Sequence, residues 1–112
     1  MSVLDAGAGQ CRVTRALLSA SYEVKGVELS KGSLDEFCQD LIERKIVFQT
    51  GLDALPFLNS SFDVVFSSEV LEHVPEGIVQ ASVNELSRVT KGPIFATLSF
   101  SLSCRPIQGT CQ

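Results

Sequence analysis

The chain of 112 residues is poor in positive charge and has no long apolar run. Its 9 Lys and Arg residues stand against 13 Asp and Glu residues, which gives a formal net charge of −4 at pH 7. Nucleic acid is disfavoured as a partner, because binding a phosphate backbone requires clustered positive charge. The longest apolar runs, such as 64–66, contain only three residues, whereas a membrane-spanning helix needs about 20.

The N-terminal residues, MSVLDAGAG, lack the basic start and the apolar stretch of a secretory signal. We therefore expect a soluble, cytoplasmic protein with no membrane partner. The 4 cysteines form no C-x-x-C pair and have no histidine at zinc-finger spacing. Reduced thiols are the favoured state in such a compartment, although the even number of cysteines leaves disulfides open as the alternative.

The composition, with 45% apolar and 20% charged residues, is typical of a globular core. The length predicts one domain over residues 1–112, with a regular part at about 2–100 and an irregular tail at 101–112. Short β-branched runs alternate with segments of helical periodicity. We expect strands at 2–6, 22–29, 45–50, 62–67 and 94–100, and helices at 10–20, at about 30–42 and at 76–89.

This alternation, with short connections, predicts an α/β fold: a doubly wound parallel sheet with helices on both faces. Ligands in such sheets bind at the carboxyl ends of the strands, near the point where the strand order reverses. The functional residues should therefore follow the ends of four strands, at Ala6, Leu29, Thr50 and Ser67.

Two glycines, Gly7 and Gly9, follow the first strand in the segment DAGAGQC. Glycine lets a ligand approach the backbone closely, although a glycine pair alone also suits an ordinary tight turn. Asp5 ends the strand, and its charge would repel a pyrophosphate but favour a ligand with an ammonium and a sulfonium. Cys11 lies two residues after Gly9, and the third glycine of a dinucleotide-binding fingerprint, G-x-G-x-x-G, would fall on the next residue, Arg12.

Glu28 ends the second strand, nineteen residues after Gly9. An acidic residue about 20 residues beyond the glycine loop hydrogen-bonds ribose hydroxyls in nucleoside-binding α/β folds. For Glu28 alone, a solvated carboxylate at a strand end is an equally good explanation. Together with Asp5 and the glycine loop, it indicates a nucleoside cofactor with a cationic tail.

The segments VLDAGAGQC, GVELS and LDALPFLNSSFDVVFSSEVLEHV, with the following helix and strand, resemble class I S-adenosylmethionine-dependent methyltransferases. The resemblance covers about residues 2–99 and is greatest to the small-molecule methyltransferases. It implies a Rossmann-like core with strand order 3-2-1-4-5 and S-adenosyl-L-methionine as the cofactor. It implies that the methionine end of the cofactor lies over Gly7 and Gly9 and that the ribose binds Glu28. Adenine would lie against Leu29 and the turn at Leu52 and Asp53. Ser67 and Ser68 would line the floor near the sulfonium.

Three features depart from the family pattern. Cys11 replaces the usual third glycine. The family's adenine-binding Asp falls on Gly51, so a backbone amide at Leu52 or Asp53 would have to serve instead. Family members normally have helices before the first strand and, after the fifth, a helix and two more strands, whereas this chain has SLSCRPIQGTCQ. We therefore expect a core that lacks the last strands, as a fragment or alternative product of a longer protein.

Glu69, Glu72 and His73 would share one face of a helical turn after the fourth strand. This segment resembles the metal-binding segment of ubiquinone-pathway O-methyltransferases and small-RNA 2′-O-methyltransferases, where a divalent cation would orient a substrate hydroxyl. Local hydrogen bonding is the favoured alternative, because metal-free family members carry similar stretches and a hard cation prefers more oxygen ligands. His73 is also the best candidate for a general base.

The resemblance thus implies an S-adenosylmethionine-dependent methyltransferase that acts on a small-molecule acceptor. The alternative is a truncated, non-catalytic module that binds cofactor or a protein partner without turnover. A nicotinamide-dependent oxidoreductase is disfavoured by Asp5 and by the lack of a third glycine at Cys11 or Arg12. Without a closing hairpin, the fifth strand would be an exposed edge, and this predicts self-association.

Overall fold

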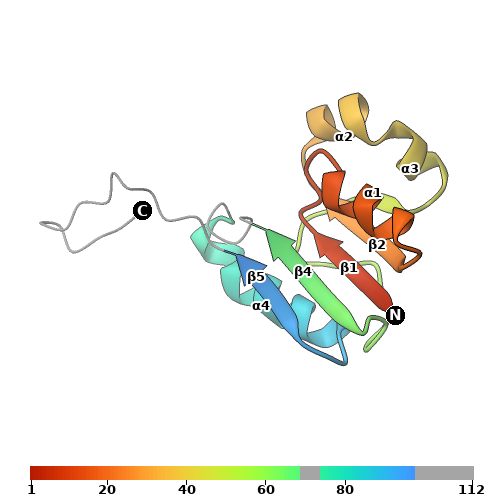
Figure 1. The fold of residues 1–112 in the computed structure, drawn as a ribbon. Coiled ribbons are helices and arrows are strands. Elements are labelled where there is room, and N and C mark those ends of the chain that lie inside the picture. The colour runs from red at the N-terminus through yellow and green to blue at the C-terminus, as the bar shows by residue number, and fades with distance from the viewer. Residues whose placement is uncertain (69–73, 98–112) are drawn as a thin grey trace, which may run out of the picture.

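The computed structural model describes residues 1–68 and 74–97. Five parallel strands form one sheet in the order β3-β2-β1-β4-β5 (Figure 1), which confirms the predicted α/β fold and strand order. The strands are β1 (Ser2–Ala6), β2 (Glu23–Glu28), β3 (Val47–Gln49), β4 (Val64–Ser68) and β5 (Ile94–Thr97). The helices are α1 (Arg12–Ser19), α2 (Lys31–Phe37), α3 (Gln39–Glu43), the 3₁₀ turn η2 (Glu76–Ile78) and α4 (Val79–Val89).

Buried apolar residues form two clusters. Because side chains alternate along a strand, Leu4 and Ala6 of β1 point to the same face of the sheet. There they pack with Leu86 and Val89 of α4. The second cluster lies beneath α2 and α3 and contains Ala8, Cys11, Leu34, Cys38, Leu41, Ile46 and Val47. The sheet is therefore covered by helices from both sides, as the sequence pattern predicts.

The single helix expected over about 30–42 is wrong, because the chain forms two short helices that break at Cys38. The Ser30 side chain caps the first of them by accepting a hydrogen bond from the Ser33 amide at 3.3 Å. Cys38 has φ −124° and ψ 10°, which are not helical values. The break turns Cys38 and Leu41 inward, where both side chains are fully buried.

Two apolar side chains lie at the surface, although each stands in a helix or strand that packs against the core. Val83 of α4 is 38% exposed and Phe95 of β5 is 57% exposed, whereas Phe62 is buried. Phe95 borders an open apolar hollow of about 610 Å³ on the α1 side of β1, β4 and β5, lined also by Val3, Val13, Leu17, Tyr22, Val64 and Phe66. Among the described residues β5 pairs only with β4, so it is an edge strand. Self-association through this edge stays a prediction.

In the part of the chain that the structure describes, no helix is long and apolar enough to cross a membrane. Residues 69–73, which carry most of the helical turn expected after the fourth strand, lie outside the described residues, and so do residues 98–112, which include the expected tail at 101–112.

Candidate functional site: a hollow at the carboxyl ends of the strands

A hollow of about 670 Å³ opens where β1, β2 and β3 end. The strand order reverses between β1 and β4, so the hollow lies beside the switch point at which parallel sheets bind ligands. Its walls come from the loop after β1, the end of β2, the turn after β3 and the segment leading into α4. The lining residues are Gly7, Gly9, Val27, Glu28, Leu29, Ser30, Thr50, Gly51, Leu52, Asp53, Val74, Pro75, Ile78 and Ser82.

The loop after β1 is shaped by two glycines with positive φ, 81° at Gly7 and 57° at Gly9. The amides of Gly7 and Ala8 both donate to the Val27 carbonyl, at 2.9 and 2.8 Å, and so tie the loop to β2. A Cβ at Gly9 would meet no atom within 4 Å, because this face of the loop is open. A ligand in the hollow can therefore lie directly against the backbone.

Glu28 is held by the backbone on both sides of its carboxylate. Its Oε1 accepts from the Gly9 amide at 2.7 Å, and its Oε2 accepts from the Ser30 amide at 3.0 Å. Each carboxylate oxygen can accept two hydrogen bonds, so one position on each oxygen remains. Glu28 is thus preorganised to accept hydrogen bonds from two neighbouring hydroxyl groups.

Asp5 lies beneath the glycine loop rather than in the lining of the hollow. Its side chain is 2% exposed and accepts a hydrogen bond from the Thr14 hydroxyl at 2.6 Å. Burial raises the pKa of the Asp5 carboxyl, and the Thr14 hydrogen bond opposes that change. Asp5 therefore joins β1 to α1 directly, and its predicted action on a ligand ammonium would operate through the loop.

The turn after β3 forms an apolar wall opposite the glycine loop. Leu29, the residue after β2, is 66% exposed although it is apolar, and it lines the hollow together with Leu52. At Gly51 a Cβ would come within 2.8 Å of the Asp53 carboxylate, so the turn is closely folded there. A flat aromatic ligand group would cover the exposed apolar surface of Leu29.

An ion pair on α4 holds the loop that continues this wall, and sequence reasoning missed it. Arg88 contacts Glu85 at 2.6 Å and donates to the carbonyls of Leu55 and Phe57, at 3.1 and 2.8 Å. Glu85 in turn accepts from the Leu55 amide at 2.8 Å. The Arg88 guanidinium and the Leu55 amide keep the pKa of Glu85 below its usual value. The i, i+3 spacing could have indicated the ion pair, but not the backbone groups that it holds.

The remaining predicted residues are placed as follows. Ser67 is fully buried, and its hydroxyl has no hydrogen-bond partner among the described residues. It does not line the hollow. The strand containing Ser68 is described, whereas Glu69, Glu72 and His73 lie outside the described residues. Within 1–68 and 74–97, no group of three His, Cys, Asp or Glu side chains could hold a metal ion.

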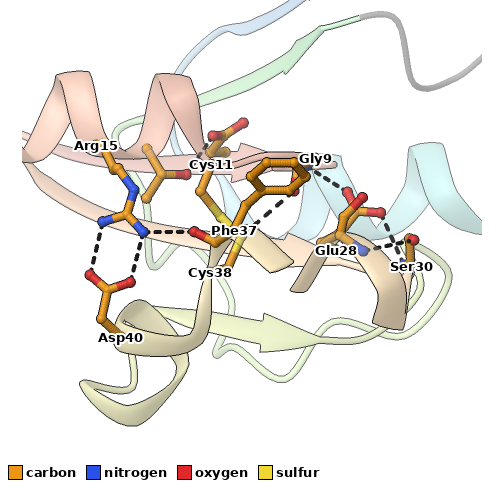
Figure 2. The surroundings of a disulfide bond; sticks show 11 residues. Gly9, Cys11, Arg15, Glu28, Ser30, Phe37, Cys38 and Asp40 are labelled. Carbon is orange, nitrogen blue, oxygen red and sulfur yellow. Dashed lines mark hydrogen bonds and ion pairs between the residues drawn. A yellow bond between two sulfur atoms is a disulfide. The ribbon is translucent and has the colours of Figure 1, made fainter. Parts of the chain in front are cut away.

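A disulfide bond joins Cys11 to Cys38 beside the glycine loop (Figure 2). The expectation of reduced thiols is wrong for this pair. Cys11 begins α1 and Cys38 stands at the break between α2 and α3, with 6.2 Å between the two Cα atoms. The bond was not predictable from spacing, because the fold brings together residues 27 positions apart.

Comparisons with known proteins support the geometry. Residues 4–93 match a family described as "Methyltransferase domain". The chain is 33% identical over 107 residues to the ubiquinone biosynthesis O-methyltransferase of Methylococcus capsulatus, covering 88% of this chain and 44% of that protein. The chain thus spans less than half the length of this curated relative.

Two solved structures share the fold. The YcgJ protein of Bacillus subtilis has a TM-score of 0.66 at 28% identity, over 80% of this chain and 39% of its own. A putative S-adenosyl-L-methionine-dependent methyltransferase of Methanococcus maripaludis has a TM-score of 0.71 at 17% identity, over 87% and 48%. With the family match spanning most of the chain, the protein belongs to the class I S-adenosylmethionine-dependent methyltransferases.

Proposed function

We propose that this chain is the cofactor-binding core of an S-adenosylmethionine-dependent methyltransferase that acts on a small molecule. The observation that carries the proposal is Glu28, whose carboxylate is fixed at the hollow by the amides of Gly9 and Ser30. Two free acceptor positions on a fixed carboxylate suit the adjacent hydroxyls of a ribose.

The rest of the hollow supports a nucleoside with a cationic tail. In the proposed pose, adenine lies against Leu29 and the Leu52–Asp53 turn, and the methionine end lies over Gly7 and Gly9. Asp5 lies beneath the glycine loop, where its carboxylate would favour a cationic tail. Ser67 is buried in β4 and does not line the hollow, so its contact near the sulfonium stays a prediction.

The proposed reaction is an in-line displacement at the methyl group that the bound cofactor supplies. Because that group is already activated, this chain's residues mainly orient the donor and exclude water around it. A general base is needed only for a protonated nucleophile, and His73 stays the candidate for that role. Metal binding by Glu69, Glu72 and His73 likewise stays a prediction.

A hydroxyl-bearing small molecule is the proposed acceptor class. The support comes from the ubiquinone biosynthesis O-methyltransferase relative, which is 33% identical. The alternative, a module that binds cofactor or a protein partner without turnover, is favoured by the open apolar hollow around Phe66 and Phe95.

Calorimetric titration of the full chain with S-adenosylhomocysteine and with NAD tests the proposal. We expect one site for S-adenosylhomocysteine and none for NAD. Hydrogen bonds to a charged group contribute about 1.5–3 kcal/mol, so Glu28→Ala should weaken binding by one to two decades. Glu23→Ala, at the exposed start of the same strand, is the matched control and should bind normally. Binding of NAD alone, or equal affinity in a folded Glu28→Ala chain, would contradict the proposal.

A further inference from the structure

Cys11 has a backbone conformation that glycine adopts easily and cysteine does not. Its φ of 64° lies in the left-handed region, where a Cβ is crowded. The side chain is also fully buried, and its sulfur is bonded to Cys38. A residue keeps such a conformation only when its surroundings hold it there, and positions of this kind concentrate at functional sites. Here the disulfide is one of the groups that hold it.

The sulfur of Cys38 also touches the cofactor loop itself. It lies 3.6 Å from the Gly9 carbonyl oxygen, which would accept a hydrogen bond from Cys38 as a free thiol. Gly9 is the residue whose amide fixes Glu28, at 2.7 Å. Figure 2 shows Cys38 and Glu28 on either side of Gly9. The disulfide therefore lies in direct contact with the loop that holds the proposed ribose ligand.

We propose that Cys11 and Cys38 form a reversible thiol–disulfide site that sets the affinity of the hollow for its nucleoside ligand. This rests on the proposed function of that hollow. The oxidant is a low-molecular-weight disulfide. One cysteine thiolate attacks it, forming a mixed disulfide and releasing one thiol; the second cysteine then displaces the other thiol. Two electrons pass to the small disulfide, and the two thiol protons end on the two released thiols.

The expected effect is local, because a second connection holds the same elements together. Arg15 of α1 pairs with Asp40 of α3 at 2.7 Å and donates to the Phe37 carbonyl at 2.7 Å. These contacts remain when the disulfide is reduced, so α1 stays attached to the break between α2 and α3. Cys11, no longer bonded, can leave its left-handed conformation, and the loop from Gly9 to Cys11 loses its fixed shape.

The direction of the coupling follows from this loss of order. Binding to the reduced chain must fix the backbone of a residue that the disulfide fixes beforehand, and this lowers the association constant by about tenfold per residue. The reduced chain should therefore bind S-adenosylhomocysteine about tenfold more weakly than the oxidised chain. Coupling between two sites is reciprocal. Saturating ligand should therefore shift the thiol–disulfide equilibrium by about the same factor toward the disulfide.

The test uses the full chain with Cys104→Ser and Cys111→Ser, so that only one pair can form. S-adenosylhomocysteine affinity is measured after oxidation by glutathione disulfide and after reduction by a phosphine. Cys38→Ser is the matched control, and its affinity should equal that of the reduced chain under both conditions. Circular dichroism checks that the reduced chain keeps its α/β spectrum.

A second measurement does not require the Cys38→Ser control. The fraction of disulfide is determined in a glutathione redox buffer, with and without saturating S-adenosylhomocysteine. Equal affinity of both redox states, or no shift of the redox equilibrium, would overturn the inference and leave the proposed function intact. A reduced chain that has unfolded would also overturn it, because the bond would then hold the whole domain. Failure of every redox state to bind would instead refute the proposed function.

Discussion

The two walls of the hollow are held in place by different means. The glycine-loop wall is fixed by a covalent bond at Cys11 and by a buried hydrogen bond between Asp5 and Thr14. The opposite wall, after β3, is fixed by the Arg88–Glu85 ion pair, which reaches across from α4 to backbone groups of its loop. The first wall therefore depends on redox state and the second on side-chain charge. Two independent perturbations should separate their contributions to binding.

The largest effect is expected at Gly9, on the covalently held wall. A valine there would place a branched side chain in the open space of the hollow and disfavour the observed φ of 57°. Binding of S-adenosylhomocysteine should be lost in calorimetry, while circular dichroism stays α/β. Gly32→Val is the control, since its Cβ would meet only the Ser30 hydroxyl, at 3.9 Å. Normal binding by Gly9→Val would show that the loop does not touch the ligand.

Reduction of the disulfide should give the next largest effect, on stability. A bond that closes a loop of 27 residues lowers the entropy of the unfolded chain by an amount equivalent to about 3.5 kcal/mol in the chain-entropy account. Urea unfolding of the Cys104→Ser, Cys111→Ser chain, with and without reductant, measures the difference. Identical free energies of unfolding would mean that the pair is not bonded in solution.

On the ionically held wall, Arg88→Met should weaken the attachment of the loop at Leu55 and Phe57 to α4. The carbonyls of Leu55 and Phe57 would lose their charged donor, and the turn at Leu52 would become less ordered. We expect roughly tenfold weaker binding of S-adenosylhomocysteine, in the oxidised and the reduced chain alike. Arg12→Met, at an exposed position of α1, is the control. Loss of binding only in the reduced chain would mean that the two walls are not independent.

Asp5→Asn should give the smallest effect, with opposite signs for stability and binding. Burial raises the pKa of the Asp5 carboxyl in the folded state, so a protonated Asp5 stabilises the fold at a pH below its unfolded-state pKa. This contribution to the free energy of unfolding is lost as the pH rises through the folded-state pKa. Asn is neutral at all pH values and can still accept from Thr14. We expect greater stability at pH 7 than for the unchanged chain, and weaker binding of a cationic ligand. Lower stability at pH 7 would contradict this account of Asp5.

The sequence was sufficient to predict the strands and the residues that follow their carboxyl ends, but not the disulfide beside them. Gly7, Gly9 and Glu28 follow strand ends, and parallel strands bring their carboxyl ends to one edge whatever the helices do. The resemblance to a known family added the strand order, which alternation alone leaves open. The exposed Phe95 was not predicted, because its burial depends on what covers that face of the sheet rather than on its own strand.

The contacts that hold the walls were less predictable. Thr14, Arg88 and Cys38 act on the hollow through partners that are distant in sequence. Arg88 reaches 33 positions back to the Leu55 carbonyl, and no local pattern specifies that distance. The break at Cys38 was missed because its apolar stripe continues from α2 into α3, so periodicity indicated one helix.

A crystal structure of the oxidised chain with S-adenosylhomocysteine would show whether Glu28 and the hollow hold the nucleoside. We expect both ribose hydroxyls within hydrogen-bond distance of the Glu28 carboxylate. We also expect adenine against Leu29 and the homocysteine end over Gly9. A ligand seated in the apolar hollow beside Phe95, or one whose ribose makes no contact with Glu28, would refute the proposed site.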